Sequence, residues 1–126
     1  MTPDEFPRHF AAAFATQDLA QLAAMFQPDA TLATLTGLWA ETPEAIEAAF
    51  ESEMAGIFQT ARLVTGKGTL RDLSPEASLL RQRYTISGAQ TETGEELPRF
   101  AAMLVAVLEN SAAGWQVQSM TFTALP

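Results

Sequence analysis

Few side chains in this sequence are suited to acid–base or covalent chemistry. There is one histidine, His9, and no cysteine, which excludes thiol catalysis, disulfides, zinc–thiolate sites and iron–sulfur clusters. His9 could serve as a general acid or base near the mouth of a pocket. No residue that would orient its ring is evident, so we favour a position at the solvent edge of a helix. The sequence therefore predicts no defined catalytic residue, no metal ion and no cofactor.

Glutamates form two groups, one along the face of an expected helix and one in a polar stretch (Glu44, Glu47 and Glu51; Glu92, Glu95 and Glu96). Charge runs of this kind usually face water, so we expect them to be solvated rather than to bind metal. Gly66-Lys67-Gly68 is not a P-loop, because the required spacing and the following helix are both missing. None of these segments predicts a site.

Two arginines allow a different chemistry. Arg81 and Arg83 lie two residues apart, so on a strand they share one face, while Gln82 and Tyr84 share the other. If the arginine face lines a pocket, the pair could hold an anion or a carbonyl-rich ligand. If it faces outward, the pair is a solvated edge or a subunit contact, which we favour because arginine is rarely buried unpaired. The sequence leaves open which pair faces the interior.

Length and charge predict one globular domain over residues 1–126. Fifteen acidic residues against seven Lys and Arg give a formal net charge of −8. This charge disfavours nucleic acid and anionic membrane as partners, because both require a positive surface. The first residues lack the pattern of a signal peptide, and the longest apolar run, 100–108, is too short to cross a membrane. We therefore expect a cytoplasmic protein.

Three helices are expected in the first half of the chain. The segment 2–5, Thr-Pro-Asp-Glu, has the pattern of a capping box, and phenylalanines at helical spacing follow it. A short helix begins after Asp18 and ends at Pro28-Asp29. A third begins at Thr42-Pro43 and ends near Gly56. The apolar residues of each helix recur on one side, which predicts that this side packs against a hydrophobic core.

Six strands are expected, over 30–35, 38–40, 61–73, 77–87, 97–109 and 115–124. The order α-α-β-β-α-β-β-β-β with short links predicts an α+β domain with an antiparallel sheet and helices on one face. The segment 100–108 is apolar at every position, whereas a strand with one wet face would alternate. Its second face must be covered by pocket contents or by another subunit. We favour a homodimer through the sheet.

Several segments together resemble the nuclear transport factor 2-like superfamily, in its SnoaL-like and ketosteroid-isomerase-like branch. They are FATQDLAQLAAMF at 14–26, PDAT at 28–31, GLW at 37–39, PEAI at 43–46 and GWQV at 114–117. The resemblance implies a cone-shaped, cystatin-like fold, with helices on a curved antiparallel sheet and a pocket at the wide end. It implies no single function, because members include isomerases, cyclases, dehydratases, ligand binders and association domains.

The resemblance also allows ketosteroid isomerase activity to be tested against the residues. That reaction needs a carboxylate base, a tyrosine and a protonated aspartate. The position of the base is Thr34, that of the tyrosine is Phe10, and that of the aspartate falls in the segment 104–106, where nothing ionises. Phe50 and Phe122 likewise stand where cyclase and dehydratase relatives often carry histidine or another polar residue. We therefore expect no isomerisation of 3-ketosteroids.

The candidate pocket residues are mainly aromatic or apolar: Phe10, Phe14, Thr34, Trp39, Phe50, Met54, Tyr84, Met103 and Phe122. Trp39 and Tyr84 are the strongest candidates for ligand contact, because each joins an apolar ring to a polar group. The favoured interpretation is a domain that binds an apolar small molecule without catalytic machinery. The alternatives are a SnoaL-like isomerase or cyclase acting on a polyketide-like substrate, and an oligomerisation module whose interior is filled by its own side chains. An open cavity would separate the first two from the third.

Overall fold

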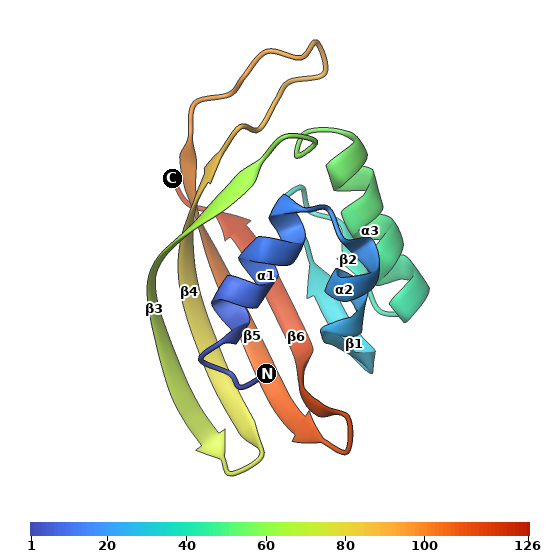
Figure 1. Cartoon of the computed structure of the whole chain (residues 1–126), viewed down its shortest axis with the longest axis vertical. Helices are drawn as coiled ribbons and strands as arrows, with labels where there is room; N and C mark the ends of the chain where they lie inside the picture. The colour runs from blue at the N-terminus through green and yellow to red at the C-terminus, as the bar shows by residue number, and fades with distance from the viewer.

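The computed structural model describes residues 1–126, and its elements follow the expected order (Figure 1). Three helices lie on one side of a six-stranded sheet. The helices are α1 (Phe6–Ala15), α2 (Leu19–Ala24) and α3 (Pro43–Ala55). The strands are β1 (Phe26–Ala33), β2 (Trp39–Ala40), β3 (Arg62–Ser74), β4 (Ala77–Ser87), β5 (Phe100–Ser111) and β6 (Gly114–Ala124).

The caps of α2 and α3 form as the sequence predicts. The Thr42 side chain accepts a hydrogen bond from the backbone N–H of Ala45, and Pro43 occupies the first turn of α3. The Asp18 side chain accepts from the backbone N–H of Gln21 at the start of α2. Both bonds satisfy amide groups that have no partner within the helix.

The start of α1 differs from a full capping box. The Glu5 carboxylate accepts from the Thr2 backbone N–H (2.9 Å) and hydroxyl (2.7 Å), but the Thr2 hydroxyl accepts nothing from the helix. Half of the capping box is therefore present, because Thr2 donates instead of accepting. These two bonds hold the pKa of Glu5 below its ordinary value, since they favour the charged carboxylate.

The sheet has the strand order β2-β1-β6-β5-β4-β3. All neighbours are antiparallel except β1 and β6, which run parallel. The expectation of an entirely antiparallel sheet was therefore wrong at one pair. Tight turns impose antiparallel pairing on consecutive strands, whereas β1 and β6 lie far apart in the sequence and only packing decides their direction.

Strand β1 also begins earlier than expected. It starts at Phe26, and α2 ends at Ala24, so Pro28 and Asp29 lie inside a strand rather than at the end of a helix. The register of β1 against β6 shifts between Phe26 and Thr31. Pro28 is tolerated there, because an irregular stretch does not require its missing N–H.

Alternation along the strands produces two different sheet faces. Towards the helices, β4, β5 and β6 present fully buried side chains such as Tyr84, Leu104 and Met120. Together with the helices they form a single core cluster of 28 buried residues.

None of the three helices has the length and apolar character needed to span a membrane.

Gly88 and Gly94 allow a direct test of this packing. Both have positive φ, at +79° and +85°, but a Cβ on Gly88 would lie 2.5 Å from the Thr60 carbonyl oxygen, whereas a Cβ on Gly94 would meet nothing within 4 Å. Gly88→Ala should therefore lower the free energy of unfolding in urea by more than about 2 kcal/mol. The control Gly94→Ala should cost about 1 kcal/mol. Equal losses would show that the close approach to Thr60 is unimportant.

Candidate functional site

The interior between helices and sheet is occupied by aromatic rings centred on Phe10 of α1. The Phe10 ring lies 5.8 to 6.3 Å, between centroids, from five other rings: Phe6, Phe14, Phe50, Tyr84 and Phe122. Most of these pairs are tilted or edge-on, the arrangements that aromatic quadrupoles favour. None of the six side chains is more than 4% exposed. The rings therefore fill the space in which an apolar ligand would lie.

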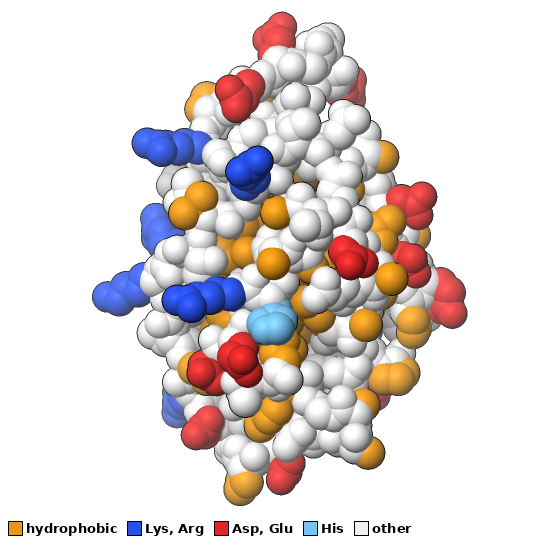
Figure 2. Space-filling model, viewed as in Figure 1, with side chains coloured by type: hydrophobic (Ala, Val, Ile, Leu, Met, Phe, Trp, Pro, Cys, Tyr) orange, Lys and Arg blue, Asp and Glu red, His pale blue; other side chains and the backbone are white.

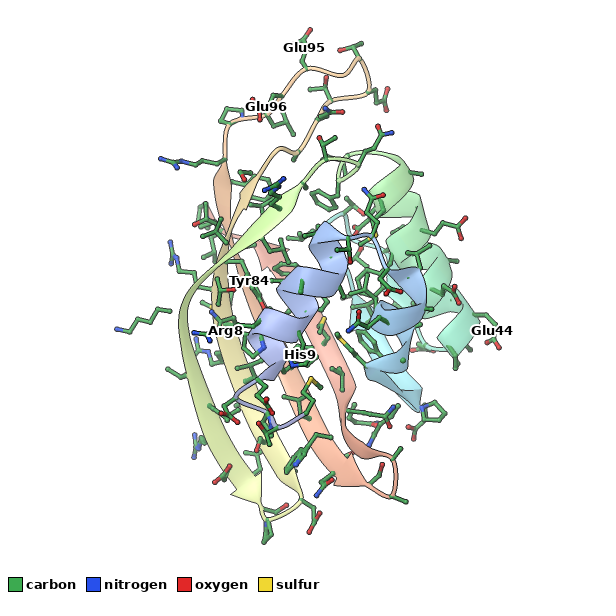
Figure 3. The ribbon with its side chains drawn as sticks, in the orientation of Figure 1. Arg8, His9, Glu44, Tyr84, Glu95 and Glu96 are labelled. Carbon is green, nitrogen blue, oxygen red and sulfur yellow. The ribbon has the colours of Figure 1, made fainter.

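Tyr84 contributes the only hydroxyl of this cluster, and the hydroxyl is already engaged. It donates a 2.7 Å hydrogen bond to the backbone carbonyl of Pro7, in the first turn of α1. Burial raises the pKa of Tyr84 above its ordinary value of 10.0, because the phenolate would be poorly solvated. Figure 3 shows Tyr84 beside α1. At neutral pH the group therefore serves as a neutral donor that ties the helix to the sheet.

The two faces of β4 differ in burial. Gln82 and Tyr84 are buried on the helix side, whereas Arg81 and Arg83 are exposed on the opposite side. This resolves the alternative that the sequence left open. The arginines do not line the interior, in agreement with the difficulty of burying an unpaired guanidinium.

Five of the nine candidate pocket residues come together in the aromatic cluster: Phe10, Phe14, Phe50, Tyr84 and Phe122. Met54 and Thr34 are also buried, on α3 and just after β1. Trp39 and Met103 do not join them, and their expected placement was wrong. Trp39 is 69% exposed, because the two-residue strand β2 turns Ala40 inward instead. Met103 lies on the other face of β5, since Ala102 and Leu104 point to the helices.

Glu53 is a buried carboxylate that the sequence analysis missed. It is 4% exposed, and its Oε2 accepts hydrogen bonds from the backbone N–H (3.0 Å) and hydroxyl (2.5 Å) of Thr36. Two residues earlier in the turn, the Thr34 hydroxyl accepts from the Leu38 N–H. The helical spacing could have predicted this burial, because Glu53 falls within the buried stripe of α3, between Phe50 and Met54. The carboxylate holds the β1–β2 turn against the end of α3.

A hollow of about 610 Å³ lies next to this polar group, between the end of α3 and the loop that follows β4. Its lining combines polar side chains with apolar ones, including Thr36, Ile57, Gln90 and Leu97. A volume of this size falls in the range typical of small-molecule sites. This hollow, and not the aromatic interior, offers room for a ligand.

Charged side chains surround a second hollow, of about 490 Å³, at the start of α1. Asp4, Glu5, Arg8 and His9 line it together with Gln82. His9 is exposed on α1, in agreement with the solvent-edge position that we favoured, and Figure 2 shows the single histidine at the surface. The neighbouring carboxylates of Asp4 and Glu5 accept hydrogen bonds from Thr2 and not from the His9 ring, so no acid–base pair is formed there.

The two glutamate groups face solvent. Glu44, Glu47 and Glu51 are exposed along α3, and the loop glutamates are exposed as well. Figure 3 shows Glu44 pointing outward from α3, and Glu95 and Glu96 on the loop that extends beyond the sheet. One member of each group lines a hollow: Glu92 lines the hollow of about 610 Å³, and Glu51 lines one of about 300 Å³ beside α2 and α3.

The outer sheet face, the one turned away from the helices, remains uncovered within the chain (Figure 1). Its centre carries the half-buried side chains of Met103, Val105 and Val107 on β5. On β6, the Gln118 side-chain oxygen is buried within the chain and has no hydrogen-bond partner, which is costly.

Neither a family model nor a curated protein matches the chain, but solved structures do. An uncharacterised protein with a cystatin-like fold from Caulobacter vibrioides has a TM-score of 0.84 and 18% identity, over 94% of this chain and 84% of that one. A putative calcium/calmodulin-dependent protein kinase II association domain from Xanthomonas campestris has a TM-score of 0.83 and 21% identity, over 98% and 85%.

A ketosteroid isomerase-like protein from Erwinia carotovora atroseptica has a TM-score of 0.81 and 16% identity, over 97% of this chain and 93% of that one. Others are described as nuclear transport factor 2-like. The chain therefore has the cystatin-like fold of the nuclear transport factor 2-like proteins, which confirms the resemblance at the level of the fold. Identities this low carry no activity from these proteins to this one.

Tyr84 is the only tyrosine of the chain, so its ionisation can be followed by ultraviolet absorbance. Because its pKa is raised in the folded state, the unfolded chain loses this proton first as the pH rises. The contribution of Tyr84 to the free energy of unfolding should be complete below about pH 10 and should decline above it. Tyr84→Phe should abolish this part of the decline and cost about 1–2 kcal/mol at neutral pH. Ionisation at the same pH in folded and urea-unfolded protein would contradict the assignment.

Proposed function

We propose that this chain is a self-associating module of the nuclear transport factor 2-like fold, in which two copies pair through the outer sheet face. The observation that carries the proposal is the filled interior: the Phe10 ring is 0% exposed and packs on five other rings. An interior of this kind supports packing rather than substrate binding. It favours the third interpretation of the sequence, an oligomerisation module filled by its own side chains.

The outer sheet face supports pairing. Met103, Val105 and Val107 provide an apolar centre, and hydroxyl-bearing side chains of β6 such as Thr121 surround it. A contact that covers this centre would remove apolar surface from water, at roughly 25 cal/mol per Å². The similarity to a putative association domain agrees with this proposal.

The proposal predicts the effect of a charge placed at the centre of the outer sheet face. Wild-type protein at micromolar concentration should have the mass of a dimer in light scattering, and Val105→Glu should have that of a monomer, because a buried unpaired carboxylate is strongly disfavoured. Leu38→Glu is the matched control, since Leu38 is exposed in the β1–β2 turn, and it should remain dimeric. A monomeric wild type, or an unchanged Val105→Glu dimer, would refute pairing through this face.

Small-molecule binding is the second candidate function, and the hollow of about 610 Å³ favours it. Thr36 lines this hollow, and the buried Glu53 carboxylate holds Thr36 in place through two hydrogen bonds. A fixed polar group beside Ile57 and Leu97 could orient a ligand that has both apolar and polar parts. An apolar ligand within the aromatic interior would instead require the rings around Phe10 to separate. An isomerase or cyclase would additionally need a base, and Phe10 and Thr34 supply none.

Native mass spectrometry of freshly purified protein distinguishes the two candidates. If self-association is the main function, the spectrum should show dimers with no added mass. A retained small molecule that is lost on Thr36→Arg, a substitution that fills the hollow, would establish the binding function instead. Phe10→Leu is the control for ligand in the interior, since it opens space only among the rings.

A further inference from the structure

Positive charge in this acidic protein is concentrated in one place. Five of the seven Lys and Arg residues lie on the outer side of the β3–β4 hairpin: Arg62, Lys67, Arg71, Arg81 and Arg83. All five side chains are exposed, and we call them the basic face. Figure 2 shows the blue side chains along the edge formed by β3, and the red ones over α3, at the loop end, and also below α1 and towards the tip of the β3–β4 hairpin. A protein with net charge −8 thus keeps a positive surface at one sheet edge.

Strand β3 is also the edge strand of the sheet, at the end opposite β2. Residues 68–74 are all exposed, and Leu70 and Leu73 are 40% and 53% exposed. One side of this stretch pairs with β4, and no other strand lies beyond it. A length of seven residues spans about 20 Å, enough for an added strand of ordinary length. The edge therefore offers unpaired backbone groups together with exposed apolar side chains.

The basic face determines what can pair with this edge. A second copy of β3 would bring Lys67 and Arg71 close to the same cations of its partner, which is unfavourable, and charged residues commonly protect edges in this way. The register of β3 against β4 shifts at two places, between Thr65 and Gly68 and between Asp72 and Ser74, and these shifts affect any added strand alike. An acidic strand encounters the opposite situation, because the same cations attract it. The cations of the basic face therefore disfavour pairing of β3 with a second copy of itself and favour pairing with an acidic strand.

We propose that the free edge of β3 binds an extended acidic segment of a partner protein, which adds to the sheet as a seventh strand. Side chains that alternate along the added strand would lie about 5 Å from their neighbours on β3. Carboxylates on the outer side would face Lys67 and Arg71, and apolar side chains on the inner side would cover Leu70. The backbone of the segment would pair with the free groups of residues 68–74.

A small hollow on the basic face adds room for a carboxylate. It measures about 260 Å³ and is lined by Lys67, Gly68, Thr69, Arg81 and Met103. Two cations and a hydroxyl converge there over an apolar floor. Glutamate has a carboxylate at the end of a short apolar stem, so it matches this combination of groups.

A protein segment fits this edge better than other anions do. Nucleic acid and anionic lipid lack the peptide backbone that would pair with the edge of β3. The backbone edge of β3 lies two strands away from Val105, although the hollow on the basic face shares Met103 with the outer sheet face. Strand addition at residues 68–74 does not require pairing through the outer sheet face, so either proposal can fail alone.

The test uses full-length protein and a synthetic ten-residue peptide in which glutamate and valine alternate. Fluorescence anisotropy at low salt measures binding, and hydrogen exchange of residues 68–74 reports strand addition. We expect saturable binding, slower exchange in β3, and a loss on the order of tenfold in Lys67→Glu/Arg71→Glu. Arg8→Glu is the control for a charge reversal away from the edge, because Arg8 is exposed on α1, and it should bind normally.

Two further probes separate strand addition from attraction between charges. A peptide of equal charge with proline at two central positions should bind much more weakly, since it lacks the backbone N–H groups that pair with the edge. A single-stranded DNA oligonucleotide should bind less tightly than the alternating peptide. The proposal is overturned if the wild type does not bind the peptide, if Arg8→Glu loses as much affinity as the double variant, if the proline peptide binds equally well, or if DNA binds more tightly.

Discussion

Helix α1 is held across the sheet by one ring, that of Phe10, which contacts aromatic side chains from α1, α3, β4 and β6. Burying a phenylalanine contributes roughly 1.5–3 kcal/mol, and ring pairs add to this. The Tyr84 hydroxyl fixes the same helix through Pro7, so the helix can neither slide along the sheet nor rotate without breaking a buried hydrogen bond. Elements distant in sequence are thereby positioned from a single centre.

Because the aromatic rings around Phe10 fill the interior, the features that could bind a partner or a ligand lie at the surface. In proteins of this fold the space between helices and sheet can hold a ligand, but here the rings occupy it, and the one hydroxyl among them is engaged. The remaining features are external: the hollow beside Thr36, the apolar centre of the outer sheet face and the basic edge of β3. The two sheet surfaces are attached to the core through residues that pack on the inner side of the same strands, and the hollow is attached to it through Thr36, which Glu53 holds.

The β3 edge shows how a local irregularity becomes part of such a surface. The side-chain amide of Gln82, itself 4% exposed, donates to the carbonyls of Gly66 and Arg83 at the bulge, both at 2.9 Å. A Cβ on Gly68 would lie 2.1 Å from the Gln82 side-chain oxygen, so a side chain there would displace the Gln82 amide from its position. These contacts stabilise the bulge that places Lys67 beside Arg81. The motif Gly66-Lys67-Gly68, which has no phosphate-binding pattern, thus has a structural role.

Local patterns were sufficient to predict much of this fold. Caps and periodicity located α3 and β4 closely, because Thr42-Pro43 and strict alternation act within a few residues. The same alternation placed Arg81 and Tyr84 on opposite faces, but only the tertiary structure decided which face was inside. The parallel pairing of β1 with β6, the burial of Glu53 against Thr36 and the exposure of Trp39 also came from contacts between distant segments. The sequence determined which side chains could face the core, and long-range packing decided whether the space among them was left open or filled.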